Sequence, residues 1–560
     1  MNTHAPSPRR ILVAVAWPYA NGSLHLGHIA GAYLPADIFA RYHRMVGDDV
    51  LMVSGSDTHG TPITVRADAE GRTPQQVVDE FHPEFLRYWR ELGISFDLFT
   101  STGTENHAEV THDIFRRLMA NGYIYKGTTS QFYDPQAQRF LPDRYVEGAC
   151  PHCAYEKARG DQCDNCGRTL DPDQLINPRS KLTGATPEAR DTEHFFLKLS
   201  AFQEPLLAWL RSREGWRKHV LNFSIGFVEE GLHDRAITRD LEWGVTLPVE
   251  DLGPGKRIYV WFEAVIGYLS ASKEWAKLRG EPDAWKKWWE DPEARGYYFI
   301  GKDNIPFHTI VWPAILMGYG GLNLPFDVPA NQYVTFKGEK ASKSEGVGEP
   351  VLSYLERYQP DAIRYGLAAN LPETSDTDLT EAELVRRNND ELVATWGNHV
   401  NRVLAMTHKN FDGIVPQPGP FDERDQRLLE GAAAMLDGVQ AHLEAVHLKA
   451  ALHAAMALAQ EANAYLSDTE PWKTAKTDRE RTATSLYVAL CAINALKVAL
   501  YPFLPFSSQK VHDYLGLTGA IEDAGWEARR PEPGTKLQQP EPLFKKIEVA
   551  EVEGEARLSA

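Results

Sequence analysis

The sequence predicts an α/β protein in which a parallel-sheet domain is split by a cysteine-bearing insertion and followed by a small linking α/β region and a C-terminal α-helical bundle. Three observations support this prediction. Short apolar runs, which suit buried parallel strands, occur near the N-terminus and again near residue 300. Two pairs of cysteines lie between those runs, and the last third of the chain is rich in alanine and leucine with helical periodicity. At 560 residues the chain exceeds what one hydrophobic core normally serves, so several domains are expected.

Residues 1–125 are predicted to form the first half of a Rossmann-like domain. The continuous apolar run 11–16 is short enough for a buried parallel strand, and a second such run covers 50–54. Residues 21–23, Asn-Gly-Ser, supply turn and helix-capping chemistry after the first strand. The order of strand, turn and helix is that of a nucleotide-binding α/β domain.

Two histidines begin the helix expected after the first strand. His25 and His28 are three residues apart and therefore share a helix face, close to the free N–H groups that a helix N-terminus offers to an anion. Gly27 leaves room for a flat base against the backbone. Two capping or core histidines would explain most isolated pairs with this spacing, but the strand-turn-helix context favours phosphate binding.

Residues 126–235 form the insertion, and its four cysteines predict a metal site. Cys150 and Cys153 make one C-x-x-C pair, and Cys163 and Cys166 make a second pair after nine intervening residues. This spacing suits one tetrahedral Zn²⁺, and a four-cysteine site has no open position for water, so its expected role is structural. Free or redox-active thiols are the alternative. Cys491 lies in an apolar helical pattern and is expected to be a small buried side chain.

The parallel-sheet domain is predicted to resume over 236–325, with strand character at 259–261 and 297–300. Residues 326–390 then contain the peptide Lys340-Ala341-Ser342-Lys343-Ser344, which has glycines on both sides at 338, 346 and 348. A solvated lysine loop is the default interpretation. The flanking glycines nevertheless favour a hinged segment that brings Lys340 and Lys343 to phosphoryl oxygens, where positive charge stabilises a transition state.

The helical bundle is predicted over 391–545, with helices at 432–450 and 486–500 and interruptions at Pro471 and at 501–508. Asn398 and Arg402 are four residues apart and share a helix face, whereas Trp472 follows the helix break. Residues 546–560 are expected to be a tail. The proline-rich stretch before it is expected to wrap the surface or fray.

The composition limits the possible functions. The formal net charge of −18 argues against indiscriminate nucleic-acid binding through overall charge, so any RNA contact must be local. No apolar run approaches the roughly 20 residues of a membrane span, and no targeting segment is recognised. A cytoplasmic protein that does not bind membranes is therefore expected.

In its histidine and lysine peptides the chain resembles the class I aminoacyl-tRNA synthetases, whose signatures are His-Ile-Gly-His and Lys-Met-Ser-Lys-Ser. Over nearly its whole length it resembles the methionyl-tRNA synthetases among them. The peptides that carry this likeness, besides His25-Leu26-Gly27-His28, are Pro18-Tyr19-Ala20-Asn21-Gly22, Asp57-Thr58-His59-Gly60-Thr61-Pro62, Phe140-Leu141-Pro142-Asp143-Arg144, Tyr259-Val260-Trp261, Ile266-Gly267-Tyr268, Gly301-Lys302-Asp303 and Phe307-His308. Two departures are Ala341, in place of the usual methionine, and Trp17, in place of a smaller aliphatic residue.

The resemblance implies a two-step ligase. Methionine and ATP give methionyl-adenylate and pyrophosphate, and the methionyl group then passes to the terminal adenosine of tRNA(Met). The implied catalytic residues are His25, His28, Lys340 and Lys343. The implied ATP-binding residues are Tyr19, Asn21, Gly27, His28, Ser342 and Lys343. The implied methionine-binding residues are Ala16, Trp17, Tyr19, Asp57, Trp261, Tyr268, Phe307 and His308.

The resemblance also implies that the insertion is a zinc-knuckle connective domain and that residues 326–390 form a stem-contact region. It implies in addition that the bundle is an anticodon-binding domain. Asn398, Arg402 and Trp472 match the positions that read the anticodon. Mg²⁺ is expected with ATP because it neutralises phosphate oxygens. A monomer is preferred, since no further dimerisation domain is recognised after the bundle.

Taken without the resemblance, the site residues have ordinary structural interpretations. Trp261 and Phe307 could be core aromatics, Asp57 a helix cap, and Trp472 a buried tryptophan. Two rival functions also stay open. One is a small-ligand adenylyltransferase of the same superfamily, which needs no anticodon bundle. The other is a synthetase-like RNA-binding regulator without catalysis, which the presence of both histidines and both lysines disfavours.

Overall fold

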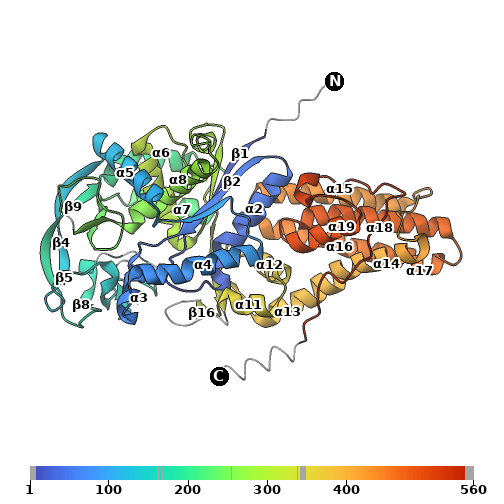
Figure 1. Cartoon of the computed structure of the whole chain (residues 1–560), viewed down its shortest axis with the longest axis horizontal. Coiled ribbons are helices and arrows are strands. Elements are labelled where there is room, and N and C mark those ends of the chain that lie inside the picture. The colour runs from blue at the N-terminus through green and yellow to red at the C-terminus, as the bar shows by residue number, and fades with distance from the viewer. Residues whose placement is uncertain are drawn as a thin grey trace.

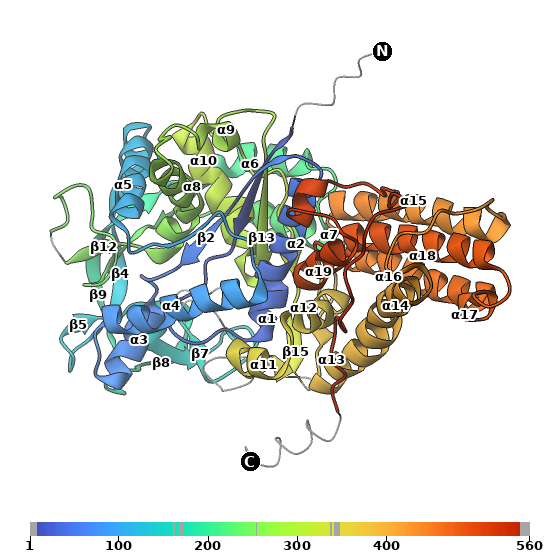
Figure 2. The same ribbon diagram turned by 45° about the vertical axis from the view of Figure 1, so that its right-hand side comes forward.

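The computed structural model describes residues 8–548 except 161, 162, 167, 169, 171, 254, 337, 338 and 341–347, and it leaves the side chains of Asp143, Glu339 and Lys340 undescribed. The described chain is elongated (Figures 1 and 2). An α/β part with its insertion occupies one end, and the helical bundle, coloured orange to red, occupies the other.

A five-stranded parallel sheet organises the α/β part. Its strand order is β14-β13-β1-β2-β3, with β1 in the centre. The bounds are β1 Arg10–Val15, β2 Asp49–Ser56, β3 Leu98–Ser101, β13 Arg295–Gly301 and β14 Ala330–Asn331. Val13 of β1 pairs with Met52 on one side and Tyr297 on the other. The predicted strands at 11–16, 50–54 and 297–300 are therefore confirmed, and the two halves of the domain meet at the central strand.

Helices cover both faces of this sheet, which explains why its strands are continuous apolar runs. The helical bounds here are α1 Leu26–His28, η1 Ile29–Tyr33, α2 Leu34–Met45, α3 Thr61–Glu70, α4 Pro74–Leu92, α5 Glu105–Ala120, α8 Val260–Leu278, α9 Lys286–Trp289, η5 Lys302–Asn304, η6 Phe307–Val311 and α10 Trp312–Tyr319. The helix that begins at α1 continues through the wider turn of η1 into α2.

The predicted strand at 259–261 is wrong. The strand there, β12 (Lys256–Ile258), ends before Tyr259 and pairs antiparallel with β11 (Thr238–Asp240). Tyr259 is the N-cap of α8, and Val260 and Trp261 lie in its first turn. A short apolar run does not distinguish a buried strand from a buried helix, and α8 is buried along most of its length.

The insertion folds into two small antiparallel sheets with the orders β10-β9-β4-β5 and β7-β6-β8. Its elements are β4 Ile124–Asp134, β5 Arg139–Phe140, η2 Asp143–Tyr145, β6 Val146–Ala149, β7 Ala158–Arg159, η3 Pro172–Gln174, β8 Ile176–Ser180, β9 Glu188–Leu197, η4 Leu199–Phe202, α6 Gln203–Arg211, α7 Lys218–Glu229 and β10 Arg235–Ala236. The β7-β6-β8 sheet has its own small core, which includes Val146, Cys150, Ala158 and Cys163.

A linking region connects the α/β part to the bundle. It contains a small sheet of β15 (Val334–Phe336), β16 (Glu339–Lys340) and β17 (Thr377–Asp378), and the helices α11 Val351–Arg357, α12 Pro360–Ala369 and α13 Glu381–Arg387. β16 pairs antiparallel with β15, so the backbone of Lys340 lies opposite Thr335.

The bundle consists of η7 Asn388–Gly397, α14 Asn398–Phe411, α15 Glu423–Glu444, α16 Leu448–Thr469, α17 Pro471–Thr474, α18 Arg479–Leu500, α19 Pro505–Tyr514 and η8 Ile521–Ala524. The predicted helix 486–500 is confirmed within α18, and Pro471 separates α16 from α17 as expected. The predicted helix 432–450 is wrong as one element, because the chain turns at Val446, where φ is +54°. The interruption predicted at 501–508 is shorter, since α19 starts at Pro505.

One described helix, α18, reaches the length and apolarity of a membrane span, which the sequence analysis did not expect. Its apolar window is entirely buried inside the bundle. Cys491 lies in this helix and is buried, as predicted. After η8 the proline-rich stretch packs along the bundle, where Leu537 and Phe544 are buried, so it wraps the surface.

Candidate functional site

A cavity of about 920 Å³ lies at the carboxyl ends of the central strands. Ala16 follows β1, Asp57 follows β2 and Asp303 follows β13, and all three line the cavity. This is the edge at which open parallel sheets bind ligands, because helix N-termini and loops converge there. Most of the predicted ATP and methionine residues also line it, namely Trp17, Tyr19, Asn21, Gly27, His28, Trp261, Tyr268 and His308, together with the predicted catalytic residue His25.

The two signature histidines lie against each other at the start of the first helix. His25 is the N-cap of α1, and its backbone N–H donates to Nδ1 of His28 at 3.3 Å. Their ring centroids are 3.8 Å apart. A Cβ at Gly27 would lie 2.9 Å from Nδ1 of His25, so glycine gives the His25 ring room over the backbone. Residues 21–23 precede this cap and do not themselves cap the helix.

Asp57 is held at the end of β2 by its backbone. Its N–H donates to the carbonyl of Pro18 at 2.8 Å, and its carbonyl accepts from Ala20 at 3.0 Å. The side chain is buried, and burial together with the nearby charge of Glu263 raises the pKa of Asp57 well above its usual value. The N-cap of α3 is Gly60, so Asp57 is not a helix cap.

Glu263, which sequence reasoning missed, lies at the centre of a buried polar cluster. It accepts hydrogen bonds from His59 at 3.1 Å and from His107. Burial opposes its ionisation, but the two histidines lower the pKa of Glu263 to about 2. Only His59 gave a signal in the sequence, as a member of the peptide 57–62. Glu263 and His107 come from α8 and α5, whose contact only the tertiary structure creates.

Aromatic rings form one wall of the cavity. Trp261 stacks on Phe307 with 4.0 Å between ring centroids and 9° between planes. Tyr19 meets the edge of Trp261 at 6.1 Å. Trp261 lines both the main cavity and an adjoining one, whereas Phe307 lines only the adjoining cavity.

Tyr268 and His308 form a buried hydrogen-bonded pair deeper in the cavity. The Tyr268 hydroxyl lies 2.6 Å from Nε2 of His308, and Nδ1 of His308 lies 2.9 Å from the carbonyl of Asn304. Burial lowers the pKa of His308 to about 4, so the imidazole is neutral at pH 7. Nδ1–H then donates to Asn304, and Nε2 accepts from Tyr268.

Trp17 fits this site because two glycines surround it. A Cβ at Gly55 would lie 2.2 Å from Cζ3 of Trp17, and one at Gly267 would lie 2.7 Å from its Cε2. Both neighbouring backbones therefore make room for the indole. Its edge lies against Tyr268, with ring centroids 6.4 Å apart.

Described residues on both sides of the lysine peptide contact the histidine signature or the residue before it. Before the peptide, Phe336 of β15 lies edge-on to His25 with 6.2 Å between ring centroids. After it, the backbones of Pro350 and His25 form a bridge, and Val351 donates to the carbonyl of Leu24 at 2.9 Å. Ser342 and Lys343 lie outside the described residues, as does the side chain of Lys340.

The insertion contributes three cationic residues that the site assignment from sequence did not include. Arg144, Arg159 and Lys181 line the main cavity. Arg144 belongs to the quoted peptide 140–144, whereas Arg159 and Lys181 gave no signal. The guanidinium carbon of Arg144 lies 5.8 Å from the ring centroid of Tyr19. The insertion thus forms a positively charged side of the cavity.

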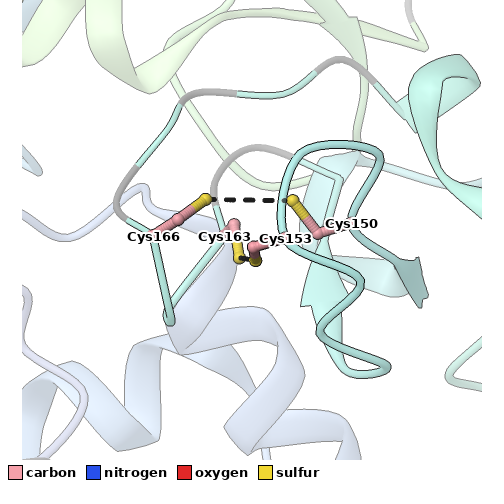
Figure 3. Close-up of side chains that lie close together, drawn as sticks. All are labelled: Cys150, Cys153, Cys163 and Cys166. Carbon is pink, nitrogen blue, oxygen red and sulfur yellow. Dashed lines mark hydrogen bonds between the residues drawn. The ribbon is translucent and has the colours of Figure 1, made fainter.

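The four predicted cysteines come together (Figure 3). Their sulfur atoms all lie within 4.8 Å of one another, with Cys150 and Cys166 3.9 Å apart and Cys153 and Cys163 3.6 Å apart. Asn165 donates to Cys153 and lowers its pKa to about 6, while burial raises the pKa of Cys163 to about 12. Such a set of sulfurs can hold one metal ion.

At the far end of the molecule, two of the three predicted anticodon residues touch. The guanidinium of Arg402 lies 5.2 Å from the ring centroid of Trp472. Trp472 is 40% exposed, so it is not a core residue. Asn398 is exposed one turn before Arg402 on α14.

Comparisons with known proteins agree with this arrangement. Residues 11–404 match the family described as tRNA synthetases class I (M), and residues 415–558 match the anticodon-binding domain of methionyl tRNA ligase. A methionine–tRNA ligase of Dehalococcoides mccartyi is 57% identical over 546 residues, covering 98% of each chain. One from Roseiflexus castenholzii is 54% identical over 588 residues, covering 99% of each chain.

Solved structures are similar as well. The crystal structure of Mycobacterium tuberculosis methionyl-tRNA synthetase bound by methionyl-adenylate is 29% identical in sequence and has a TM-score of 0.79. The alignment covers 96% of this chain and all of that one. The apo form of the same enzyme gives a TM-score of 0.72 over 98% of this chain.

Proposed function

This chain belongs to the methionyl family of class I tRNA synthetases and ligates methionine to tRNA with ATP, and from this premise we propose which residues perform each step. The carboxylate of methionine attacks the α-phosphorus of ATP, and pyrophosphate leaves. A ribose hydroxyl of the tRNA's terminal adenosine then attacks the methionyl carbonyl. An ester bond forms, the bond to AMP breaks, and the hydroxyl proton is released with AMP.

His25 and His28 bind the phosphates of ATP, and Lys340 and Lys343 neutralise charge on the pyrophosphate side. Tyr19, Asn21, Gly27 and Ser342 complete the ATP site. The observation that supports this proposal is that Phe336, before the lysine peptide, and Pro350, after it, both contact His25 of the histidine signature. The chemistry depends on positioning and charge stabilisation, so no protein nucleophile is needed.

Asp57 binds the α-ammonium of methionine, since it is a buried carboxylate at the carboxyl end of β2. Trp261, Tyr268 and His308 enclose the thioether, with Ala16 and Trp17 at its base and Phe307 supporting Trp261. The neutral Tyr268–His308 pair presents no charge to the side chain. Sulfur–aromatic contacts contribute about 0.3–1.5 kcal/mol beyond burial, which suits a thioether.

The four cysteines bind one structural Zn²⁺. A tetrahedral ion with Zn–S bonds of about 2.3 Å separates its sulfur ligands by about 3.8 Å, close to the two measured pairs of 3.6 and 3.9 Å. Such an ion would neutralise thiolates and close both knuckles. Mg²⁺ accompanies ATP and supplies charge neutralisation there.

Asn398, Arg402 and Trp472 read the anticodon of tRNA(Met). An exposed indole offers a stacking surface for an unpaired base, while amide and guanidinium groups read base edges. The proximity of Arg402 to Trp472 supports a shared surface.

We also propose that the chain divides into six regions, which are 1–125, 126–235, 236–325, 326–390, 391–545 and 546–560. We further propose that the protein is a monomer and that it is located in the cytoplasm.

Exchange of labelled pyrophosphate into ATP tests the activation step. With all twenty amino acids supplied one at a time, exchange should respond to methionine above all others. Exchange driven by leucine or cysteine would contradict the substrate assignment. Folded protein that binds tRNA but shows no exchange would favour a regulatory role.

A further inference from the structure

Glu263 carries a buried charge that no step assigned above uses. Its side chain is fully buried in the first turn of α8, where it accepts a hydrogen bond from His59 at 3.1 Å and another from His107. The described linings of the main cavity and of the adjoining one include none of these three residues. The cluster therefore lies behind the cavity wall and does not touch a bound ligand.

Stability alone does not explain a charge at this position. Moving a carboxylate out of water is unfavourable, so a buried ion pair is weak evidence for a stabilising role. Although burial opposes its ionisation, the two histidines lower the pKa of Glu263 to about 2, so the charge is present at pH 7. Buried groups with strongly shifted pKa values beside a cavity are typical of functional sites.

His59 connects this charge to the amino-acid site. Its backbone N–H donates to Oδ1 of Asp57 at 3.2 Å. Because an ionised carboxylate only accepts hydrogen bonds, Nδ1–H of His59 is the donor to Glu263. On the outer side of the loop, the indole of Trp243 donates to the carbonyl of Thr58 at 2.6 Å and lies edge-on to His59. The loop that carries the Asp57 carboxylate is thus held from outside the cavity.

The other side of Glu263 is anchored to α5, which lies beside α8 (Figures 1 and 2). His107 of α5 donates to Glu263 through Nε2, and its Nδ1 lies 2.8 Å from the hydroxyl of Ser270. That hydroxyl donates to the carbonyl of Gly267 in the same helix at 3.0 Å. Asn106 donates to the backbone carbonyl of Ser270 at 2.9 Å. The carboxylate is therefore fixed on both sides and gives His59 a fixed point of attachment.

The charge of Glu263 also acts on Asp57 directly. Burial and then the negative charge of Glu263 raise the pKa of Asp57, whereas Arg144 of the insertion acts in the opposite direction. Tyr268 of α8 also interacts with Asp57, and burial raises the pKa of this tyrosine well above its usual value, so it stays neutral. Loss of the Glu263 charge therefore lowers the pH at which Asp57 ionises.

We propose that Glu263 and His59 are positioning residues for methionine and that the hydrogen bond between them holds the Asp57 carboxylate toward the α-ammonium. The inference rests on the proposed function, in which Asp57 binds that ammonium. Neither residue touches methionine or exchanges a proton with it. Their effect is on the affinity for the amino acid, which they change equally in the ground state and the transition state.

His59→Leu tests the hydrogen bond, because it removes Nδ1–H and keeps the backbone N–H that contacts Asp57. We expect KM for methionine in pyrophosphate exchange to rise about tenfold, with kcat changed less than about twofold, as for a loss of uniform binding. His59→Asn restores a side-chain N–H donor and should recover most of the affinity. Melting temperatures verify that each variant is folded.

A double-mutant cycle tests whether His59 acts through Asp57. In the Asp57→Asn background, His59→Leu should change methionine affinity by less than about twofold, because the carboxylate that it positions is absent. Calorimetric titration with methionine measures all four affinities. Two residues that contribute independently would instead show losses that multiply.

Glu263→Gln tests the charge and keeps the shape. The amide oxygen can accept from His59, and the amide N–H can donate to Nε2 of the other tautomer of His107. We expect the pH profile of methionine affinity to be displaced to lower pH, a change that a merely structural glutamate would not cause. Glu274→Gln is the matched control, because Glu274 lies three turns further along α8 and accepts from Thr100 at 2.8 Å. It should leave KM and the profile unchanged.

The outcomes are distinct. Additive effects of His59→Leu and Asp57→Asn, or a fall in kcat without a rise in KM, would make the cluster a structural link between α5 and α8 and overturn the inference. An undisplaced profile in Glu263→Gln would also overturn it, and this variant decides the matter if His59→Leu does not fold. Wild-type affinity in Asp57→Asn would contradict both the role of Asp57 and the inference. A wild type that binds methionine without exchange would contradict only the proposed function.

Discussion

Asp37 and Arg364 form a fully buried ion pair, with 2.7 Å between Oδ2 and Nη2, that joins α2 to α12. The helix carrying Asp37 begins at the histidine signature. Arg364 also donates to the carbonyls of Pro502 and Phe503, where the bundle turns from α18 to α19. One guanidinium thus ties the helix that begins at the histidine signature to the helical bundle.

We expect Arg364→Met to destabilise the protein by about 3–5 kcal/mol, because it leaves a buried carboxylate and several carbonyls without this donor. Arg386→Met, at an exposed pair with Glu383, should change stability by less than about 1 kcal/mol.

The stability contributed by Asp37 should depend on pH. Burial opposes ionisation of Asp37, but Arg41 and Arg364 lower its pKa to about 2. Its contribution is therefore present above about pH 4 and is lost as the pH falls toward 2. Urea unfolding at pH 7 and at pH 3 measures both effects.

Lys343→Ala should slow pyrophosphate exchange by about a hundredfold with little change in methionine affinity, because the charge is needed mainly in the transition state. Lys277→Ala, at an exposed pair with Glu109, is the control. If the Lys343→Ala variant exchanges pyrophosphate at the wild-type rate, Lys343 has no role in the activation step.

Methionine affinity should rise with pH through the raised pKa of Asp57 and then level off. Below that pKa the carboxyl is protonated, and binding the ammonium requires it to lose its proton. Asp57→Asn should weaken binding at least about tenfold and flatten the profile. Calorimetric titration with methionine measures affinity across the range, and an unchanged profile in the variant would assign the titration to another group.

Trp472→Ala should lower kcat/KM for charging tRNA(Met) by about tenfold or more, in line with the loss of one stacked base, and should leave pyrophosphate exchange intact. Trp472→Phe keeps an aromatic face and should lose less. Equal damage to charging and exchange would instead indicate a structural tryptophan.

Metal analysis should find one zinc per chain, and Cys150→Ser combined with Cys163→Ser should abolish it. Chelation should then expose the insertion, residues 126–235, to limited proteolysis, because its small core contains Cys150 and Cys163. Cys491→Ser, in the bundle, is the control and should retain the metal. Full metal content in the double variant would place the site elsewhere.

Strands β1, β2 and β13 and the four-cysteine cluster follow from local sequence, since apolar runs and C-x-x-C spacing are local patterns. The error at 259–261 shows the limit of that signal, because Tyr259-Val260-Trp261 is equally apolar whether it begins a helix or forms a strand. The break at Val446 likewise depends on how α15 and α16 pack, which helical periodicity does not encode.

By itself the sequence determined the chemistry: which side chains are present, in what order, and to which family the chain's peptides are similar. Only the tertiary structure decided which side chains lie next to one another. It placed Glu263 between His59 and His107, surrounded Trp17 with Gly55 and Gly267, and brought Arg159 from the cysteine hairpin to the wall of two cavities. The physical reason is that burial, and with it pKa and pocket shape, depends on neighbours that are hundreds of residues away along the chain.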